Sequence, residues 1–326
     1  MNYMKKIAVF TSGGDAPGMN AAIRAVVRAG IYNNVEVVGI MRGYAGMVEG
    51  SFKPLVSKDV SNIIQHGGTI LKTARSKEFM KASGRKKAYD NLVKEGIEGV
   101  VAIGGNGTFT GANIFENEYN IPFVGIPGTI DNDLYGTDYC IGYDTAINTV
   151  MQALDKIRDT ASAHNRLFFV EVMGRDAGFL ALRSGISGGA EGVLIPEVPT
   201  HLDELHLYLE NKFKEKKSSG IIVVAEGEEE GGAYRIAKKV RKDFEDYDVR
   251  VTVLGHVQRG GSPTAFDRVS ASKMGVEAVK TLIEGKSNVM IGTKCGQLEL
   301  VPFEKAIKES KSINQKLYDL LTVLNV

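Results

Sequence analysis

Short apolar runs and polar, glycine-rich turns alternate along most of the chain. Runs this short are typical of buried strands in a parallel sheet. Helices are predicted between them, at residues 19–29, 81–94, 143 to about 160 and 267–283. Because strands and helices alternate, the pattern predicts an α/β fold built on a doubly wound, mostly parallel sheet. The apolar runs lie at 7–10, 35–40, 100–103, 121–124, 166–172, 192–197, 221–226 and 250–254.

The loop after the run at 121–124 carries two carboxylates, Asp131 and Asp133. At the end of a buried strand, two carboxylates repel each other unless a cation or a proton lies between them. One interpretation is a magnesium-bound phosphate on one side and a substrate hydroxyl on the other. The other interpretation is a turn whose Asp side chains bind their own backbone. The spacing alone leaves both open.

Three predicted strands are each followed by a glycine-rich turn. The turns comprise residues 11–18, 104–108 and 173–178, and the last one carries Arg175. A strand, a glycine turn and a helix N-terminus form an anion site, because free N–H groups and the helix dipole point the same way. In a parallel sheet such loops cluster beyond the carboxyl ends of the strands. No turn matches a Walker A or GxGxxG motif. We interpret them as phosphate-binding loops.

The loop at 255–263 places His256 three residues before Arg259, beside three glycines. A histidine alone in a loop is more often structural, but a His and an Arg together suit a phosphate monoester. Phosphoryl transfer requires backbone donors, arginines, magnesium and a carboxylate that takes a proton. These residues therefore favour a phosphotransferase that acts on a small phosphorylated acceptor.

The composition of the chain limits which partners and which cellular compartment are expected. The net charge of the 326 residues is +1, which gives no reason to expect nucleic acid or a membrane surface as a partner. No apolar run is long enough to span a bilayer, and the first residues are too short for a signal peptide. Cys140 and Cys295 form no CxxC pair, which fits a reducing, cytoplasmic setting. The acidic residues 228–230 are predicted to form a solvated turn.

Four stretches, at 12–20, 127–133, 173–175 and 255–261, closely resemble bacterial ATP-dependent 6-phosphofructokinases, and the likeness covers nearly the whole chain. The resemblance implies two Rossmann-like, three-layer α/β/α domains and a homotetramer. It also implies transfer of the ATP γ-phosphate to the 1-hydroxyl of fructose 6-phosphate. The implied ATP-binding domain comprises 1–142 plus about 258–308, and the implied fructose 6-phosphate domain comprises 143–257 plus about 309–326.

The resemblance assigns roles to individual residues. Asp131 resembles the general base, Thr129, Arg175 and Gly14 complete the catalytic set, and Asn106 and Asp133 would hold Mg²⁺. The implied ATP-binding residues are Gly14, Tyr44, Arg75, Ser76, Gly105, Asn106, Gly107 and Thr108. The implied fructose 6-phosphate residues are Thr129, Ile130, Asp131, Met173, Gly174, Arg175, Glu226, His256, Val257, Gln258 and Arg259, joined by Arg166 and Arg250 from a neighbouring subunit.

The chain departs from the family pattern at the glycine loop, where Asn106 replaces an Asp that helps to hold magnesium. Asn keeps an oxygen but loses the charge, and magnesium prefers carboxylate. We therefore predict weaker magnesium use, and a low-activity or non-catalytic paralogue is the alternative. Pyrophosphate-using members carry Asp at Gly107 and Lys at Gly128. Both positions are Gly here, which favours ATP over pyrophosphate as the donor.

The resemblance also implies an effector site for ADP or phosphoenolpyruvate between subunits. Several of its usual basic side chains are replaced, at 57, 215, 218 and 219. Fewer cations bind a polyphosphate less well, so we predict weak or altered allostery. Arg24 and Arg28 share one helix face, where they either repel, join at an anion, or are simply solvated. The implied effector residues are Arg24, Arg28, Arg158, Gly189, Glu191 and Lys217.

Overall fold

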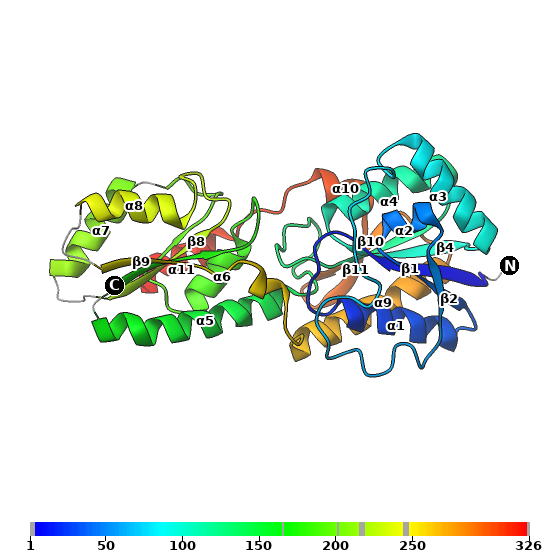
Figure 1. The fold of residues 1–326 in the computed structure, drawn as a ribbon, viewed down its shortest axis with the longest axis horizontal. Coiled ribbons are helices and arrows are strands. Elements are labelled where there is room, and N and C mark those ends of the chain that lie inside the picture. The colour runs from blue at the N-terminus through cyan, green and yellow to red at the C-terminus, as the bar shows by residue number, and fades with distance from the viewer. Residues whose placement is uncertain (1–3, 165, 201, 215–218, 244–247, 325–326) are drawn as a thin grey trace. The chain divides into compact units, whose positions relative to one another are not determined.

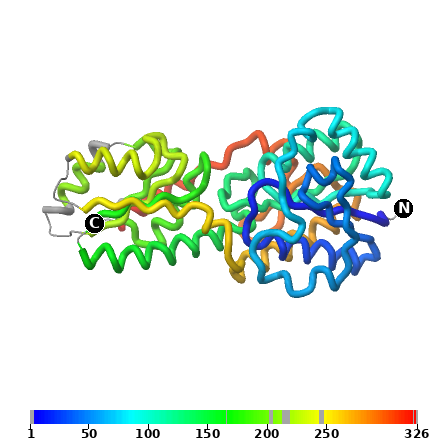
Figure 2. The backbone as a smooth tube through the Cα atoms, in the orientation of Figure 1, coloured from blue at the N-terminus to red at the C-terminus, as the bar shows by residue number. Residues whose placement is uncertain are grey.

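The computed structural model describes residues 4–164, 166–200, 202–214, 219–243 and 248–324 (Figure 1). The chain divides into two compact units, and the backbone passes between them more than once (Figure 2). Segments far apart in the sequence therefore build each unit. Unit 1 comprises Met1–Ile130, Leu134–Thr145 and Arg259–Lys311, and unit 2 comprises Asp131–Asp133, Ala146–Gln258 and Ser312–Val326.

Unit 1 contains a seven-stranded sheet in the order β11-β10-β5-β4-β1-β2-β3. The five inner strands pair in parallel, and Ala8 of β1 lies opposite both Val38 and Val100. The edge strands β3 and β11 run antiparallel to their neighbours. This confirms the expected mostly parallel α/β sheet. The strands are β1 (Lys6–Thr11), β2 (Glu36–Ile40), β3 (Phe52–Leu55), β4 (Gly99–Gly104), β5 (Phe123–Pro127), β10 (Val289–Lys294) and β11 (Gln297–Pro302).

Helices cover both faces of this sheet, with α1 and α9 on one face and α2, α3, α4 and α10 on the other (Figure 1). Gly275 of α9 allows a close approach to α1, because a Cβ added there would lie 2.6 Å from the Cβ of Ala25. The result is the three-layer arrangement that the resemblance implies. The helices are α1 (Met19–Tyr32), α2 (Tyr44–Glu49), α3 (Ala82–Glu95), α4 (Asn106–Tyr119), α9 (Ala265–Ile283) and α10 (Phe303–Lys308).

An aromatic cluster fills the core between the sheet and α4. The ring of Tyr44 stacks on Phe79 with centroids 4.0 Å apart, and Phe79 stacks on Phe115 at 5.7 Å. Phe10 and Phe123, from β1 and β5, contact the same group of rings. These rings pack the start of α2 and the middle of α4 against the sheet.

Unit 2 contains a four-stranded parallel sheet in the order β7-β8-β6-β9. Helices α7 and α8 lie on one side of it and α5 on the other (Figure 1). Leu209, Ile236 and Val240 are buried against the sheet residues Phe169 and Ile222. The elements are α5 (Tyr143–His164), β6 (Arg166–Val172), α6 (Phe179–Ser187), β7 (Gly192–Leu194), α7 (Leu202–Lys214), β8 (Gly220–Ala225), α8 (Ala233–Asp243), β9 (Asp248–Val253), the 3₁₀ turn η1 (Gly255–Arg259) and α11 (Gln315–Leu324).

Two local expectations were wrong. The acidic residues 228–230 do not form a fully solvated turn, because Glu228 is only 4% exposed and its Oε2 accepts a hydrogen bond from the backbone N–H of Glu230. The strand expected at 192–197 ends at Leu194, shortly before Pro196, whose ring cannot donate to a ladder. None of the described helices combines the length and the apolar character that a membrane crossing needs.

Candidate functional site

The loop after β1 forms a tight glycine turn against a distant arginine. Gly13 has a φ of +84°, and a Cβ added at Gly14 would lie 2.4 Å from the Nη1 of Arg259. The same Nη1 donates to the carbonyl of Asp15 over 3.3 Å. Only glycine at position 14 lets the guanidinium approach the turn this closely. Gly14 and Arg259, expected in separate nucleotide and sugar sets, are therefore neighbours.

The loop after β4 opens α4 and presents exposed backbone at its tip. No side chain caps this helix among the residues that the structure describes. Asn106 and Gly107 are exposed, and a Cβ added at Gly107 would meet no atom within 4 Å. At the base of the loop, a Cβ added at Gly104 would lie 2.3 Å from the Oγ1 of Thr108. The loop is packed below and open above, which suits a phosphate at a helix N-terminus.

The end of β5 lies beside this loop. The N–H of Gly128 donates to the carbonyl of Gly104 over 2.9 Å, and a Cβ added at Gly105 would lie 3.7 Å from the Cβ of Thr129. Thr129 is 8% exposed and Asp131 is 5% exposed. A carboxylate this deeply buried is held where solvent competes little for its proton.

Tyr44, which the resemblance assigns to the ATP-binding set, lies buried beside the first turn of α4. The side chain is 7% exposed, and its hydroxyl donates to the carbonyl of Thr108 over 2.5 Å. Burial holds the pKa of Tyr44 well above its usual value, so the hydroxyl keeps its proton and remains a donor. Tyr44 therefore supports the first turn of α4 from behind.

Arg75 and Ser76 lie on the segment before the aromatic cluster. The Oγ of Ser76 accepts a hydrogen bond from the N–H of Phe79 over 3.1 Å, which fixes this turn. The Arg75 side chain is exposed and makes no hydrogen bond or ion pair with the described part of the protein. Arg75 is thus an available cation in unit 1.

In unit 2, two side chains shape the loop after β6. The Oε1 of Gln258 accepts from the N–H of Met173 over 3.1 Å, and the Oε1 of Glu226 accepts from the N–H of Arg175 over 2.7 Å. Arg175 has a φ of 54°, an uncommon conformation that these contacts stabilise. Arg175 and Glu226 are both exposed, so each can also reach a ligand.

Gln258, which the resemblance assigns to the fructose 6-phosphate set, uses both ends of its side-chain amide within unit 2. The residue is fully buried, and its Nε2 donates to the carbonyl of Gly255 over 2.9 Å while its Oε1 holds Met173. With both ends of the amide used by backbone, it positions η1 against the loop after β6. Its neighbours His256 and Val257 are exposed.

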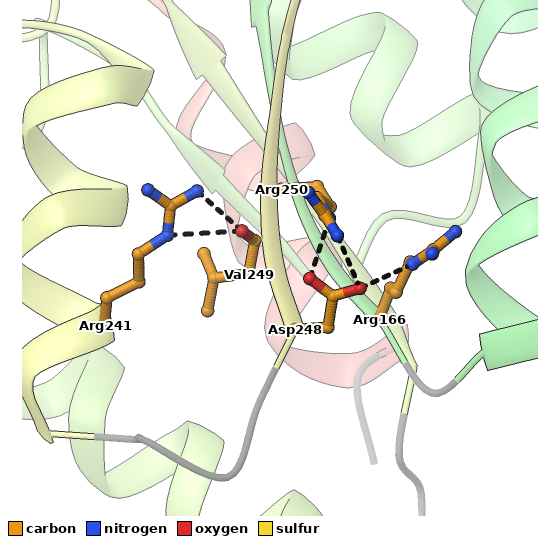
Figure 3. Close-up of polar contacts among 5 residues, drawn as sticks. All are labelled: Arg166, Arg241, Asp248, Val249 and Arg250. Atoms are coloured by element: carbon orange, nitrogen blue, oxygen red, sulfur yellow. Dashed lines mark hydrogen bonds and ion pairs between the residues drawn. The ribbon is translucent and has the colours of Figure 1, made fainter.

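Arg166 and Arg250 lie on the adjacent strands β6 and β9 and share one carboxylate, Asp248 (Figure 3). The Nε of Arg166 lies 2.7 Å from Oδ2, and the Nε of Arg250 lies 2.7 Å from Oδ1. The sequence interpretation overlooked Asp248. It precedes Arg250 by two residues on a strand, so the period of two could have placed both on one face.

The expected effector residues lie in both units, and Lys217 lies outside the described residues. Burial, and next the neighbouring Arg28, lowers the pKa of Arg24, as expected for two cations on one helix face. In unit 2 the Nη1 of Arg158 lies 3.2 Å from the Oε1 of Glu191, and its Nη2 donates to the carbonyls of Gly188 and Gly189. Arg158 is therefore already engaged within its own unit.

Comparison with known proteins decides the family. The model of the family described as phosphofructokinase matches residues 6–282. The chain belongs to this family. It is 57% identical, over the full length of both chains, to the ATP-dependent 6-phosphofructokinase 2 of Bacteroides thetaiotaomicron. It is 58% identical to the ATP-dependent 6-phosphofructokinase of Cytophaga hutchinsonii, covering 99% of this chain and 98% of that one.

A solved relative has the same phosphofructokinase fold. The crystal structure of Pichia pastoris phosphofructokinase in the T-state superposes with a TM-score of 0.89 at 38% identity. The match covers all of this chain and 39% of that longer one. The phosphofructokinase fold thus extends over the whole chain.

The oxygen donors in these loops are compatible with Mg²⁺. The described residues contain no group of three His, Cys, Asp or Glu side chains that could hold a metal. Mg²⁺ seldom needs such a group, because it is usually bound through one or two protein oxygens, water and substrate phosphates. The exposed amide of Asn106 and the half-buried carboxylate of Asp133 are hard oxygen donors of this kind.

Proposed function

We propose that this chain is an ATP-dependent 6-phosphofructokinase, a glycolytic kinase. It transfers the γ-phosphate of ATP to the 1-hydroxyl of fructose 6-phosphate and releases fructose 1,6-bisphosphate and ADP. The observation that carries the proposal is the full-length identity of 57% to a curated ATP-dependent 6-phosphofructokinase, together with the burial of Asp131 after β5. A pyrophosphate-dependent enzyme and a non-catalytic paralogue are not favoured.

Asp131 accepts the proton of the 1-hydroxyl. As that proton leaves, the sugar oxygen bonds to the γ-phosphorus, and the bond from the γ-phosphorus to the oxygen that bridges it to the β-phosphorus breaks. Thr129 and the backbone N–H of Gly14 orient the transferred group, and Arg175 neutralises its developing charge. Burial of Asp131 keeps bulk water from competing for the proton.

We infer that unit 1 holds ATP. Its phosphates would lie at the open N-terminus of α4, where Gly105, Asn106 and Gly107 present backbone donors and Thr108 closes the turn. Arg75 and the turn of Ser76 flank them, and Tyr44 supports the loop from behind. The empty space above Gly107 supports ATP as the donor, since a side chain there would occupy the space of a phosphate.

We infer that unit 2 holds the sugar phosphate. Met173, Gly174, Glu226, His256 and Val257 would contact it, Glu226 as a hydroxyl acceptor and His256 as a donor, with Ile130 and Arg259 completing the set. Gln258 would serve this set by fixing the loop that carries Met173. In a homotetramer, Arg166 and Arg250 of a neighbouring subunit would bind the 6-phosphate, because guanidinium groups match phosphate geometry.

Mg²⁺ would be held by Asn106 and Asp133, and it would neutralise charge on the phosphates of ATP. Only one of these two protein donors carries a charge, which supports weaker magnesium use. The effector arginines Arg24 and Arg28 remain available on α1, but Arg158 is engaged by Glu191. We therefore propose that the enzyme responds weakly to ADP or phosphoenolpyruvate. We also propose that it acts in the cytoplasm.

A coupled assay with fructose 6-phosphate tests the proposal, with ATP and pyrophosphate offered separately. ATP should support product formation, and pyrophosphate should not. Asp131→Asn should lower kcat by about 10²–10⁴-fold, the range typical of a lost general base. Asp90→Asn, an exposed residue of α3, is the matched control and should leave kcat unchanged. Wild-type-like turnover by Asp131→Asn would refute the assignment of the base.

A further inference from the structure

Three charged side chains lie side by side across β6 and β9 (Figure 3). Asp248 pairs with Arg166 in the ladder, and Arg250 follows Asp248 by two residues on the same strand face. The side chains are 25% exposed for Arg166, 37% for Asp248 and 54% for Arg250. Two arginines this close would repel each other without an anion between them. Asp248 supplies that anion from within the chain.

The carboxylate uses only part of each guanidinium. Arg166 contacts Asp248 through Nε at 2.7 Å, and Arg250 contacts it through Nε at 2.7 Å and Nη2 at 3.1 Å. Within the described residues, the Nη1 of neither arginine has a protein partner. Figure 3 shows the terminal nitrogens of Arg166 turned away from Asp248. Both arginines therefore retain N–H donors for a second acid.

The charge of the cluster suits a phosphate monoester. One carboxylate neutralises one of the two guanidiniums, and a net charge of +1 remains. The hydrogen bond from Arg166, followed by that from Arg250, lowers the pKa of Asp248, so this carboxylate stays ionised at neutral pH. A planar guanidinium held along its Nε edge keeps a fixed orientation, and it loses less freedom when it then binds a phosphate oxygen.

We propose that Asp248 is a positioning residue for the sugar phosphate, which holds Arg166 and Arg250 with their Nη1 groups free to bind it. This inference rests on the proposed function, which assigns the two arginines to the 6-phosphate. A different arrangement makes the opposite prediction. If Asp248 occupied the place of the phosphate, its removal would tighten fructose 6-phosphate binding rather than weaken it.

The test compares Asp248→Asn, Asp248→Glu and the control Asp319→Asn in the full-length protein. Asp319 is an exposed carboxylate of α11 in the same unit, and its side chain accepts from Gln315 rather than from an arginine. For Asp248→Asn, the KM for fructose 6-phosphate should rise about fivefold, the scale of one exposed ion pair. The KM for ATP and kcat should stay unchanged. Asp248→Glu, which restores the charge, should recover part of the affinity.

Light scattering and a thermal melt separate positioning from assembly or folding. Each variant should keep the mass and the Tm of the wild type. An unchanged or lower KM for fructose 6-phosphate in Asp248→Asn would overturn the inference, as would a parallel rise in the KM for ATP or a change in mass. The proposed function fails by a different result, namely a wild-type protein that does not phosphorylate fructose 6-phosphate with ATP.

Discussion

The hydroxyl of Tyr44 donates a hydrogen bond of 2.5 Å to the carbonyl oxygen of Thr108, and this bond joins the start of α2 to the first turn of α4. Gly111, one turn further along α4, makes room for the ring, since a Cβ there would lie 2.9 Å from it. Phe79 stacks on the ring of Tyr44 and follows the turn of Ser76. One buried tyrosine thus connects two segments proposed to bind ATP.

Tyr44→Phe removes this hydrogen bond and keeps the ring. We expect the KM for ATP to rise about threefold to fivefold, because the first turn of α4 is held less firmly, while the KM for fructose 6-phosphate stays unchanged. The free energy of unfolding should fall by about 1 kcal/mol, the usual contribution of one such bond. Steady-state kinetics and denaturant unfolding measure the two effects.

Tyr89→Phe is the matched control. Tyr89 lies on α3 and stacks on Tyr119, and in the described chain its hydroxyl makes no hydrogen bond. The control should change neither the KM for ATP nor the free energy of unfolding. An unaltered KM for ATP in Tyr44→Phe would show that Tyr44 serves the core alone.

Asn106→Asp adds a carboxylate at the exposed first residue of α4. We expect the magnesium concentration for half-maximal rate to fall and kcat to rise, because a charged oxygen binds Mg²⁺ better than an amide. The acidic group also favours the helix N-terminus, by about 0.3–1 kcal/mol. Activity titrated with Mg²⁺ at fixed ATP measures the effect.

Asn117→Asp makes the same charge change near the end of α4 and is the control. It should leave the magnesium titration where the wild type has it. Equal titrations for Asn106→Asp and Asn117→Asp would remove Asn106 from the proposed metal site.

Much of the fold could be predicted because buried parallel strands appear as continuous apolar runs. The run at 7–10 became β1 (Lys6–Thr11), and that at 100–103 became β4 (Gly99–Gly104). Helix α2 is not among the helices predicted from the sequence, because Gly43 and Gly46 weaken the helical pattern there. A Cβ added at Gly46 would lie 1.7 Å from the carbonyl of Met41, so this glycine serves close packing. Local sequence does not show such a tertiary reason.

The site could be predicted only in part for the same reason. The sequence predicts glycine turns after strands near Gly14 and Gly107, and the structure has turns at both places. The contact between Gly14 and Arg259 joins residues far apart in the sequence, and only the folded chain shows it. The supporting roles of Tyr44 and Gln258 depend on their burial, which a motif does not reveal. The residue types indicate the chemistry of the site, whereas only the folded structure shows which of these side chains are buried.

The start of α9 contains a buried carboxylate that should make stability depend on pH. Burial raises the pKa of Asp267 to about 6, against the opposing effect of hydrogen bonds from the hydroxyl of Thr145 and the N–H groups of Gly142 and Thr145. The folded pKa exceeds the unfolded value of about 3.9. The folded state therefore binds this proton more tightly, and the contribution of Asp267 to stability falls as pH rises from about 4 to about 6.

Asp267→Asn removes the titration and turns an amide NH₂ toward backbone donors. We expect it to lower the free energy of unfolding by about 1–3 kcal/mol, the cost of a buried polar group left unpaired. The difference in the free energy of unfolding between wild type and variant should become smaller as pH rises from about 4 to about 6, and it should then stay constant. Denaturant unfolding across this range measures it, and a gap that widens with pH would contradict the raised pKa.

Gly107→Asp tests whether the space beside Gly107, at the tip of the glycine loop, is occupied by the phosphates of ATP. A Cβ at Gly107 would meet no atom within 4 Å, so the protein itself has room for a side chain. The Tm should therefore match that of the wild type. If the phosphates of ATP occupy this space, the carboxylate displaces and repels them, and the KM for ATP should rise at least about tenfold, equivalent to about 1.4 kcal/mol.

Two further variants, Gly107→Ala and Asn117→Asp, distinguish the effect of side-chain size at position 107 from the effect of an added negative charge. The alanine variant adds one methyl group and should raise the KM for ATP less, and the distant Asp should not raise it at all. A calorimetric melt checks that all three variants fold alike. If Gly107→Asp binds ATP as tightly as the wild type while keeping its Tm, the nucleotide phosphates do not lie above this loop.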